Sequence, residues 1–397
     1  MQADSIVVRD IAYRGFRSAA EFGAGVLTGV ALSGDAVVLA APAGARDDTD
    51  PHTGRTARYE FGAWTAPVVS PGFTASEVIP SWTADTPPGC WLHIELRGST
   101  ADGRDTPWFT LARWTAGDGP VARTSVPGQS GPAGAVAADV LVAGPGRALT
   151  AWQLRVTLLR AAGSAATPVL RSAGAVATGA PRPDAALPSA PETAHGVVLD
   201  VPPYSQKLHI GHHPRWAGGG HGWCSPASTA MVLRFWGVGP TPADHAWVGA
   251  DHTDPDVDHA ARHCYDHAYG GTGNWPFNTA YAGRYGLDGF VTRLRSLVEA
   301  ERFIAAGIPL IVSASYVRGE IPGLDYDTAG HLMVLVGFTA TGEPVLNDPA
   351  APSNDRVRTP VPRAEFERAW LGSSRGLVYV IRPPHVPLPP PGSQPNW

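Results

Sequence analysis

The feature that most constrains the fold is a change in hydrophobic pattern near residue 180. Before it, apolar and polar residues alternate, as in WLHIELRG (91–98), where Leu92, Ile94 and Leu96 share one face, and in QLRVTLLR (153–160). A period of two is typical of half-buried strands. Turn-rich stretches of Gly, Pro and Asp separate these runs. The pattern therefore predicts a β-sandwich domain over residues 1–180.

The second half of the chain has a mixed pattern. Residues 225–237, SPASTAMVLRFWG, have apolar residues at helical spacing, a proline suited to the first turn and a glycine stop, and 296–307 form a second amphipathic stretch. Strand-like runs follow at 308–316, 331–338, 344–350 and 375–381, with a short helix predicted at 364–370. Helices followed by antiparallel strands predict an α+β domain over residues 196–384.

Two segments lack apolar periodicity. Residues 181–195 are rich in Pro and Ala and are predicted to be a linker, so we expect a fragment starting near Ala194 to fold alone. Residues 385–397, HVPLPPPGSQPNW, form a Pro-rich tail that is expected to be disordered.

Composition narrows the classes of partner and compartment. A net charge of −5 and a pI near 6.3 argue against a nucleic-acid or anionic-membrane partner, and no apolar run is long enough for a membrane span. Three cysteines with no CxxC pair predict neither a disulfide framework nor a structural zinc site. No signal peptide is visible, so the location stays open, with a secreted or cell-surface protein favoured if a signal has been removed.

Cys224 is the candidate nucleophile. It directly precedes Ser225 and Pro226 at the start of an apolar helix, where the macrodipole and free N–H groups stabilise a thiolate. Glycines at 218–220 allow backbone to approach a substrate closely. Trp223 either walls the cleft or belongs to the core.

His331 is the candidate base. It follows Gly330 at the start of the run HLMVLVGF, and VLNDP returns after a turn at 340–342. In a hairpin, the start of the first strand lies beside the end of the second. Asp348 therefore falls next to His331, where a carboxylate fixes the tautomer and orientation of an imidazole.

Four segments of the chain resemble, in order, the motifs of C39-like cysteine peptidases, a papain-like family, in its freestanding bacterial form. These segments are VPPYSQ, WCSPASTAMVLRFWG, AGHLMVLVGF and VLNDPA. The resemblance covers about residues 198–383. It implies a thiol hydrolase of peptide bonds that needs no cofactor, with Cys224 as nucleophile, His331 as base and Asp348 as orienting acid. It also implies that the amide of Gln206 helps to bind the oxyanion. Gly220, Gly330, Trp223 and Trp275 are then expected to contact the substrate.

One departure from the family pattern and two alternatives bear on this hypothesis. The family commonly has Gly after the nucleophile, and Ser225 adds a side chain that is expected to intrude on the substrate. No P-loop and no membrane span are present, which argues against leader processing coupled to export. The same thioester would also serve an acyl transferase. A non-catalytic binding protein with a hydrolase-like domain is the alternative from another class.

Aromatic and histidine clusters remain outside this hypothesis. His259, His263 and His267 recur at helical spacing, but no carboxylate completes a metal site, so the stripe is expected to line the cleft and no metal is predicted. Trp275 either shapes the cleft or packs in the core. Tryptophans at positions 64, 82, 91, 108 and 114 favour either a carbohydrate-binding surface or a sandwich core, with Trp91 predicted to point outward.

Overall fold

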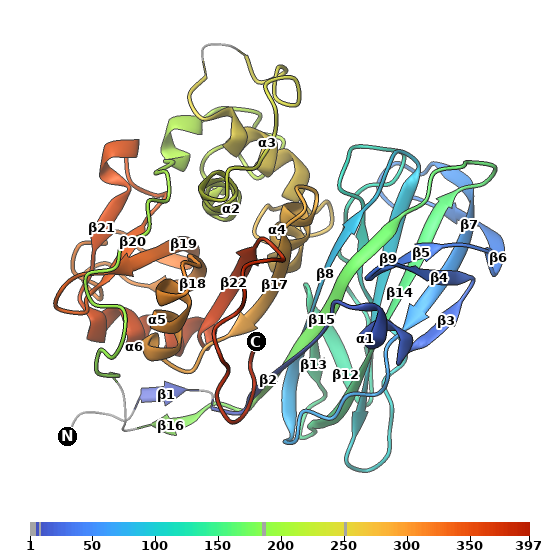
Figure 1. Cartoon of the computed structure of the whole chain (residues 1–397), viewed down its shortest axis with the longest axis horizontal. Helices are drawn as coiled ribbons and strands as arrows, with labels where there is room; N and C mark the ends of the chain where they lie inside the picture. The colour runs from blue at the N-terminus through green and yellow to red at the C-terminus, as the bar shows by residue number, and fades with distance from the viewer. Residues whose placement is uncertain (1–4, 8, 185–187, 250–251) are drawn as a thin grey trace.

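The computed structural model describes residues 5–7, 9–184, 188–249 and 252–397. Two lobes lie side by side, one built from the strands of the first half of the chain and the other from the mixed second half (Figure 1). Among the described residues, no helix combines the length and the apolar character needed to cross a membrane.

The first lobe consists almost entirely of antiparallel strands. They are β2 (Ile11–Phe16), β3 (Val26–Thr28), β4 (Val30–Ser33), β5 (Ala36–Leu39), β6 (Gly44–Thr49), β7 (Thr56–Thr65), β8 (Ala75–Asp85), β9 (Cys90–Thr100), β10 (Phe109–Trp114), β11 (Ser130–Gly131), β12 (Gly134–Ala137), β13 (Val140–Ala143), β14 (Leu149–Ala161) and β15 (Val169–Gly179), with one short helix, α1 (Ala19–Gly23). The strands β1 (Ser5–Val7) and β16 (Arg182–Asp184) form a separate two-stranded sheet beneath the second lobe (Figure 1).

Hydrogen bonds join all the strands from β2 through β15 into one large sheet. This sheet folds into two layers. One layer has the order β10-β9-β14-β7, and the other has β2-β15-β8-β13-β12-β11. A single pair, Leu149 with Ala75, connects β14 of the first layer to β8 of the second. The core fills the space between the layers.

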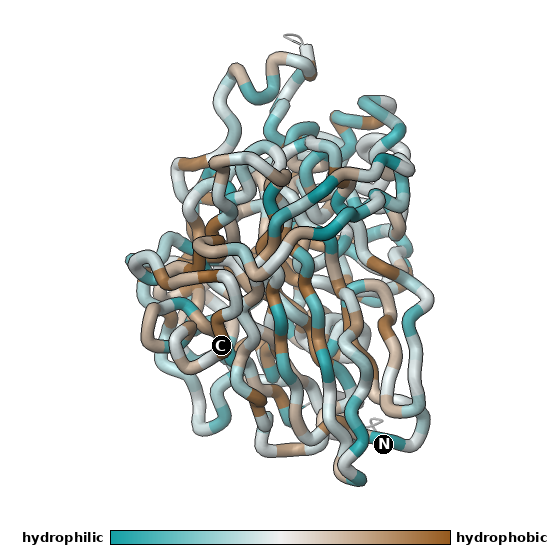
Figure 2. Tube along the Cα trace, turned by 90° about the vertical axis from the view of Figure 1, so that its right-hand side faces the viewer, coloured by the Kyte–Doolittle hydropathy of each residue, from teal (hydrophilic) through white to brown (hydrophobic). Residues whose placement is uncertain are grey.

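Alternation along the strands explains this lobe. Leu92, Ile94 and Leu96 of β9 are fully buried, as predicted. Figure 2 shows apolar and polar positions alternating along the strands that face the viewer. The strand pattern therefore identified the core-facing side of β9 correctly.

The prediction that Trp91 points to solvent is wrong. Trp91 is 1% exposed because Tyr59, Val121 and Leu159 cover the second face of its strand. Tryptophans 64, 82 and 114 are also buried, and Trp108 lies against the guanidinium groups of Arg97 and Arg155. Four of the five rings are therefore core residues, and Trp108 is half-buried.

The second lobe contains a six-stranded antiparallel sheet with the order β17-β22-β18-β19-β20-β21. Its strands are β17 (Asp288–Arg293), β18 (Leu310–Tyr316), β19 (Thr328–Phe338), β20 (Pro344–Asn347), β21 (Arg358–Pro360) and β22 (Leu377–Arg382). Its helices are α2 (Cys224–Phe235), α3 (Pro255–Cys264), α4 (Trp275–Gly283), α5 (Leu297–Ala305) and α6 (Arg363–Ser374), and the 3₁₀ turns are η1 (Gln206–His209) and η2 (Asn354–Arg356).

Helices cover both faces of this sheet. Val334 and Tyr379 face the cluster that holds α2, α3 and α4, whereas Leu335 and Val380 face the cluster that holds α5 and α6. Because neighbouring side chains in a strand point to opposite faces, a sheet buried on both sides needs nearly continuous apolar strands. The run HLMVLVGF has this character.

The core of the second lobe continues into the first. Phe277 of α4 lies with its ring centroid 6.2 Å from that of Trp82 and 5.2 Å from that of Trp114. The backbone N–H of Val291 in β17 donates to the hydroxyl of Ser81 in β8 at 2.8 Å. A fragment that starts near Ala194 would expose this apolar interface to solvent. The interface therefore argues against the expectation that the fragment folds alone.

The predicted linker and tail are held against the second lobe. β16 pairs with β1, and the Ser189 and Thr193 backbone N–H groups donate to Glu367 and Glu301 at 2.6 Å each. Residues 185–187 of the predicted linker lie outside the described residues. The tail was expected to be disordered, but the structure shows it ordered. Asn396 is buried and donates a hydrogen bond to the Arg293 carbonyl, and Trp397 packs on Phe303. The Asn396 amide and the Trp397 indole therefore hold the tail against the second lobe.

Candidate active site

The thiol of Cys224 lies at the first turn of α2. Its N-cap residue, Trp223, makes no side-chain capping bond, which leaves the first-turn N–H groups to other acceptors. The backbone N–H groups of Ser225 and Leu332 help to lower the pKa of the thiol. Helix and strand therefore both direct positive charge density at the thiol.

His331 of β19 occupies the other side of the sulfur. Its Nε2 lies 2.7 Å from Oδ1 of Asp348. Nδ1 is therefore the ring nitrogen that is left to act on the Cys224 thiol. The ring is edge-on to Tyr326, with centroids 5.6 Å apart.

Asp348 directly follows β20 and is itself held by several donors. The backbone N–H of Ala350 donates to Oδ1 and the hydroxyl of Tyr326 donates to Oδ2, both at 2.8 Å. The His331 and Asp348 side chains are each 6% exposed. The acid and the base are therefore fixed relative to each other and shielded from water.

The three groups shift one another toward their charged forms. Burial opposes ionisation of Cys224, but the hydrogen bond and charge of His331 outweigh it and lower the pKa of the thiol. Burial likewise opposes protonation of His331, but the Asp348 carboxylate raises the pKa of the imidazole to about 10. The pKa of Asp348 is lowered, because His331 overcomes the effect of burial. The arrangement favours a thiolate–imidazolium pair.

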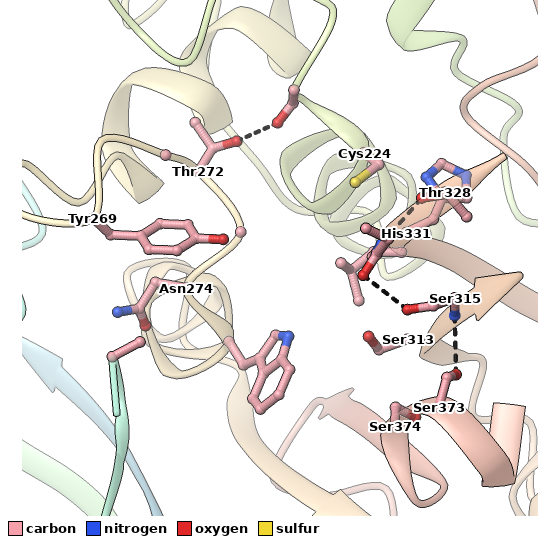
Figure 3. A pocket seen from close by; sticks show the side chains of 18 of the residues that line it. Cys224, Tyr269, Thr272, Asn274, Ser313, Ser315, Thr328, His331, Ser373 and Ser374 are labelled. Atoms are coloured by element: carbon pink, nitrogen blue, oxygen red, sulfur yellow. Dashed lines mark hydrogen bonds between the residues drawn. The ribbon is translucent and has the colours of Figure 1, made fainter. Parts of the chain in front are cut away.

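A cleft of about 1040 Å³ runs from this pair between the two lobes. Figure 3 shows the sulfur of Cys224 directed into it, with Tyr269 and Asn274 across the cleft and Ser313, Ser315 and Ser373 along one side. The turn between β12 and β13, residues 137–140, adds a wall from the first lobe. Its Asp139 carboxylate accepts a hydrogen bond from the Trp275 backbone N–H at 3.0 Å.

Both halves of the chain match known families. Residues 12–178 match the model of the Peptidase C39 N-terminal domain, and residues 198–377 match that of the Peptidase_C39 like family. The chain belongs to the C39-like peptidase family. No curated protein matches it. Membership supports a hydrolase of the cysteine peptidase type.

The residues expected to contact substrate divide into two groups in this C39-like peptidase. Trp275 and Gly330 line the cleft. Trp223 does not, because its ring is fully buried and its Nε1 donates to the Trp216 carbonyl at 2.6 Å. Gly220 is a packing position: it has a φ of +57°, and a Cβ there would lie 2.4 Å from the carbonyl carbon of His209. Trp223 and Gly220 are therefore corrected to structural residues.

Gln206 lines the cleft, but its amide is engaged with backbone. Nε2 donates to the carbonyls of Gly220 and His221 at 2.8 and 2.9 Å. The side chain therefore ties η1 to the loop that precedes the thiol. A role as oxyanion donor requires one of these contacts to be exchanged for the substrate.

Ser225 does not intrude on the cleft as expected. Its side chain is fully buried and its hydroxyl lies 2.9 Å from that of Tyr379 in β22. Because the helix directs this side chain into the core, the departure from glycine leaves the space above the thiol unchanged in this structure.

The histidine stripe does not line the cleft. α3 ends at Cys264, so His267 lies outside the helix. His259 bonds the Tyr281 hydroxyl at 2.8 Å and His263 the Ala116 carbonyl at 3.1 Å, and burial lowers the pKa of His259 to about 3. His259 and His263 are therefore core histidines that join α3 to its neighbours.

Sequence reasoning missed two contributors to the site. Tyr326, which holds Asp348, lies in an irregular loop with no motif. Glu77 of β8 lines the cleft together with Arg293 and Arg375 of the second lobe, and it pairs with both. No spacing signal links residues more than 200 positions apart in the chain.

Proposed function

We propose that this C39-like peptidase is a papain-like hydrolase of peptide bonds that works through an acyl-enzyme thioester. The Cys224 sulfur attacks the substrate carbonyl carbon, and the C–N bond breaks as His331 gives its proton to the leaving amine. Water then attacks the thioester, passing a proton to His331, and the carboxylic acid and free thiol are released. Asp348 orients the imidazole and favours its charged form.

The observation that carries this proposal is that the Cys224 thiol and the His331 imidazole line one end of the cleft together, with His331 held at 2.7 Å by the buried Asp348 carboxylate. The lowered thiol pKa and the raised imidazole pKa are what a cysteine nucleophile requires near neutral pH. A helix amino terminus that presents the thiol against a sheet that presents the imidazole supports the papain-like assignment.

Oxyanion stabilisation is assigned to two groups. The backbone N–H of Cys224 lies at the first position of α2, where helices leave donors free. Gln206 supplies the second donor by releasing one of its two backbone acceptors when substrate binds.

The cleft supports an extended peptide as substrate. Its walls come from the first lobe at 137–140, from 269–275 and from the hydroxyl-rich edges of β18 and α6. We therefore assign a sandwich domain over 1–180 that completes the cleft of a hydrolase domain over 196–384, with 181–195 as the connecting segment and 385–397 as the terminal segment.

The test is peptide-library cleavage by the full chain, read by mass spectrometry in H₂¹⁸O. We expect cleavage products with ¹⁸O in the new carboxyl group, lost in Cys224→Ala and kept in Cys90→Ala, a buried cysteine outside this cleft. Cleavage that persists in Cys224→Ala would contradict the proposal. Products that carry an added amine instead of ¹⁸O would assign acyl transfer.

A further inference from the structure

A second cluster of ionisable groups lies outside the cleft, where the loop before the thiol meets α3. His209 ends the turn η1, His212 follows in the loop, and Asp258 projects from the middle of α3. None of the three lines the catalytic cleft. His209 and Asp258 are wholly buried, whereas the His212 side chain is 16% exposed.

The three side chains converge on one point. His209 Nδ1 lies 2.7 Å from Oδ2 of Asp258, and His212 Nδ1 lies 3.1 Å from Oδ1, with one ligand atom from each residue within 4.8 Å of the others. Tetrahedral zinc at its usual bond lengths holds neighbouring ligand atoms about 3.3 Å apart. A small outward movement of each group would therefore admit the ion.

The charge of Asp258 also calls for a cation. A wholly buried carboxylate is normally paired with a positive group or bound to a metal. Among the described residues, the ion pairs of Asp258 are with these two imidazoles, which carry charge only when protonated.

One further observation places a fourth possible ligand beside these three side chains. A fourth imidazole, that of His252, stands at the exposed side, with its ring centroid 3.9 Å from that of His212.

We propose that His209, His212 and Asp258 form a binding site for one divalent transition-metal ion, with zinc the best match. Two nitrogens and one carboxylate oxygen form a ligand set that zinc accepts, and His252 or water would occupy the fourth position. This site is separate from His259, His263 and His267, whose side chains bond to Tyr281 and to backbone carbonyls.

The position of the site indicates a structural role. The loop between η1 and α2 has no regular structure and contains left-handed residues at His213, Ala217 and Gly218 to Gly220. It also carries the two carbonyls that hold Gln206. A metal that joins this loop to α3 would offset its strain and fix the edge of the cleft without touching the substrate.

The test uses the full chain with Cys224→Ala, because a thiolate–imidazole pair can itself bind zinc. After chelator dialysis, titration with Zn²⁺ should show one site per chain and a rise in Tm. Co²⁺ should give the visible absorption bands of a tetrahedral nitrogen–oxygen site. His212→Ala, at the partly exposed ligand, should weaken zinc affinity more than about tenfold. His385→Ala, at an exposed histidine far along the chain, should leave the affinity unchanged.

Circular dichroism of His212→Ala separates loss of a ligand from loss of the fold, and Asp258→Asn supplies an isosteric second variant. A protein that binds no zinc at micromolar concentrations would overturn the proposal. Binding that is equally strong in His212→Ala and Asp258→Asn would also overturn it. Because the readouts are metal content, Tm and absorption, the result does not depend on peptidase activity.

Discussion

Nε2 of His331 lies 2.7 Å from Oδ1 of Asp348, although the two residues are 17 positions apart, His331 within β19 and Asp348 just after β20. The hairpin of β19 and β20 brings them together, and Tyr326 and Ala350 hold the carboxylate from the other side. The geometry makes the charge of Asp348 the main reason that the pKa of His331 is raised to about 10. This link between one carboxylate and one imidazole has a measurable consequence.

Asp348→Asn should narrow the pH range of activity from the alkaline side. The amide still orients the ring, but without the negative charge the pKa of His331 falls, and the imidazolium is lost at lower pH. We expect the alkaline limb of kcat/KM to move down by about 1 to 3 pH units. Tyr326→Phe, which removes a donor but keeps the charge, is the matched control and should retain the wild-type limb. An unchanged limb in Asp348→Asn would remove Asp348 from this role.

Gln206→Ala should reduce kcat by about 10²–10³ if the amide supplies one oxyanion donor. KM should change little, because this interaction forms only in the transition state. If Gln206 serves only to tie the loop to η1, the variant should instead lower Tm and raise KM while kcat is largely kept. Steady-state kinetics and thermal unfolding of the same preparation distinguish the two outcomes.

The fragment 194–397 should be poorly soluble by itself, contrary to what its Pro/Ala-rich boundary predicts. It would expose Phe277, which packs between Trp82 and Trp114 in the whole chain. Co-expression with residues 1–180 should restore a soluble complex. A fragment that is soluble alone, unfolds cooperatively and keeps a reactive thiol would show that the lobes are independent.

The parts of the fold that were predictable from sequence are those with local signals. Alternation along 91–98 located the buried face of β9, and helical spacing after Cys224 located α2. The hairpin turn placed Asp348 beside His331 because strand pairing is set by short connections. These features depend on residues that are close along the chain.

The remaining features depend on which distant segments meet. Trp91 alternates outward along its strand, but Tyr59 and Leu159 of neighbouring strands cover it. The tail lacks apolar periodicity, yet Asn396 and Trp397 dock through single polar and aromatic contacts. The expected intrusion of Ser225 on the cleft is wrong, because the sequence does not show that the helix turns its hydroxyl toward Tyr379. Side-chain direction and long-range pairing were therefore the missing information.

The most direct test of the account is residue-resolved alkylation with iodoacetamide at pH about 6, read by mass spectrometry. Burial raises the pKa of Cys90 to about 11 and also raises that of Cys264, whereas His331 lowers that of Cys224. Since the thiolate is the reactive form, Cys224 should be labelled first, and its labelling should fall sharply in His331→Ala. Faster alkylation of Cys90 or Cys264, or no effect of His331→Ala on Cys224, would contradict the proposed catalytic pair.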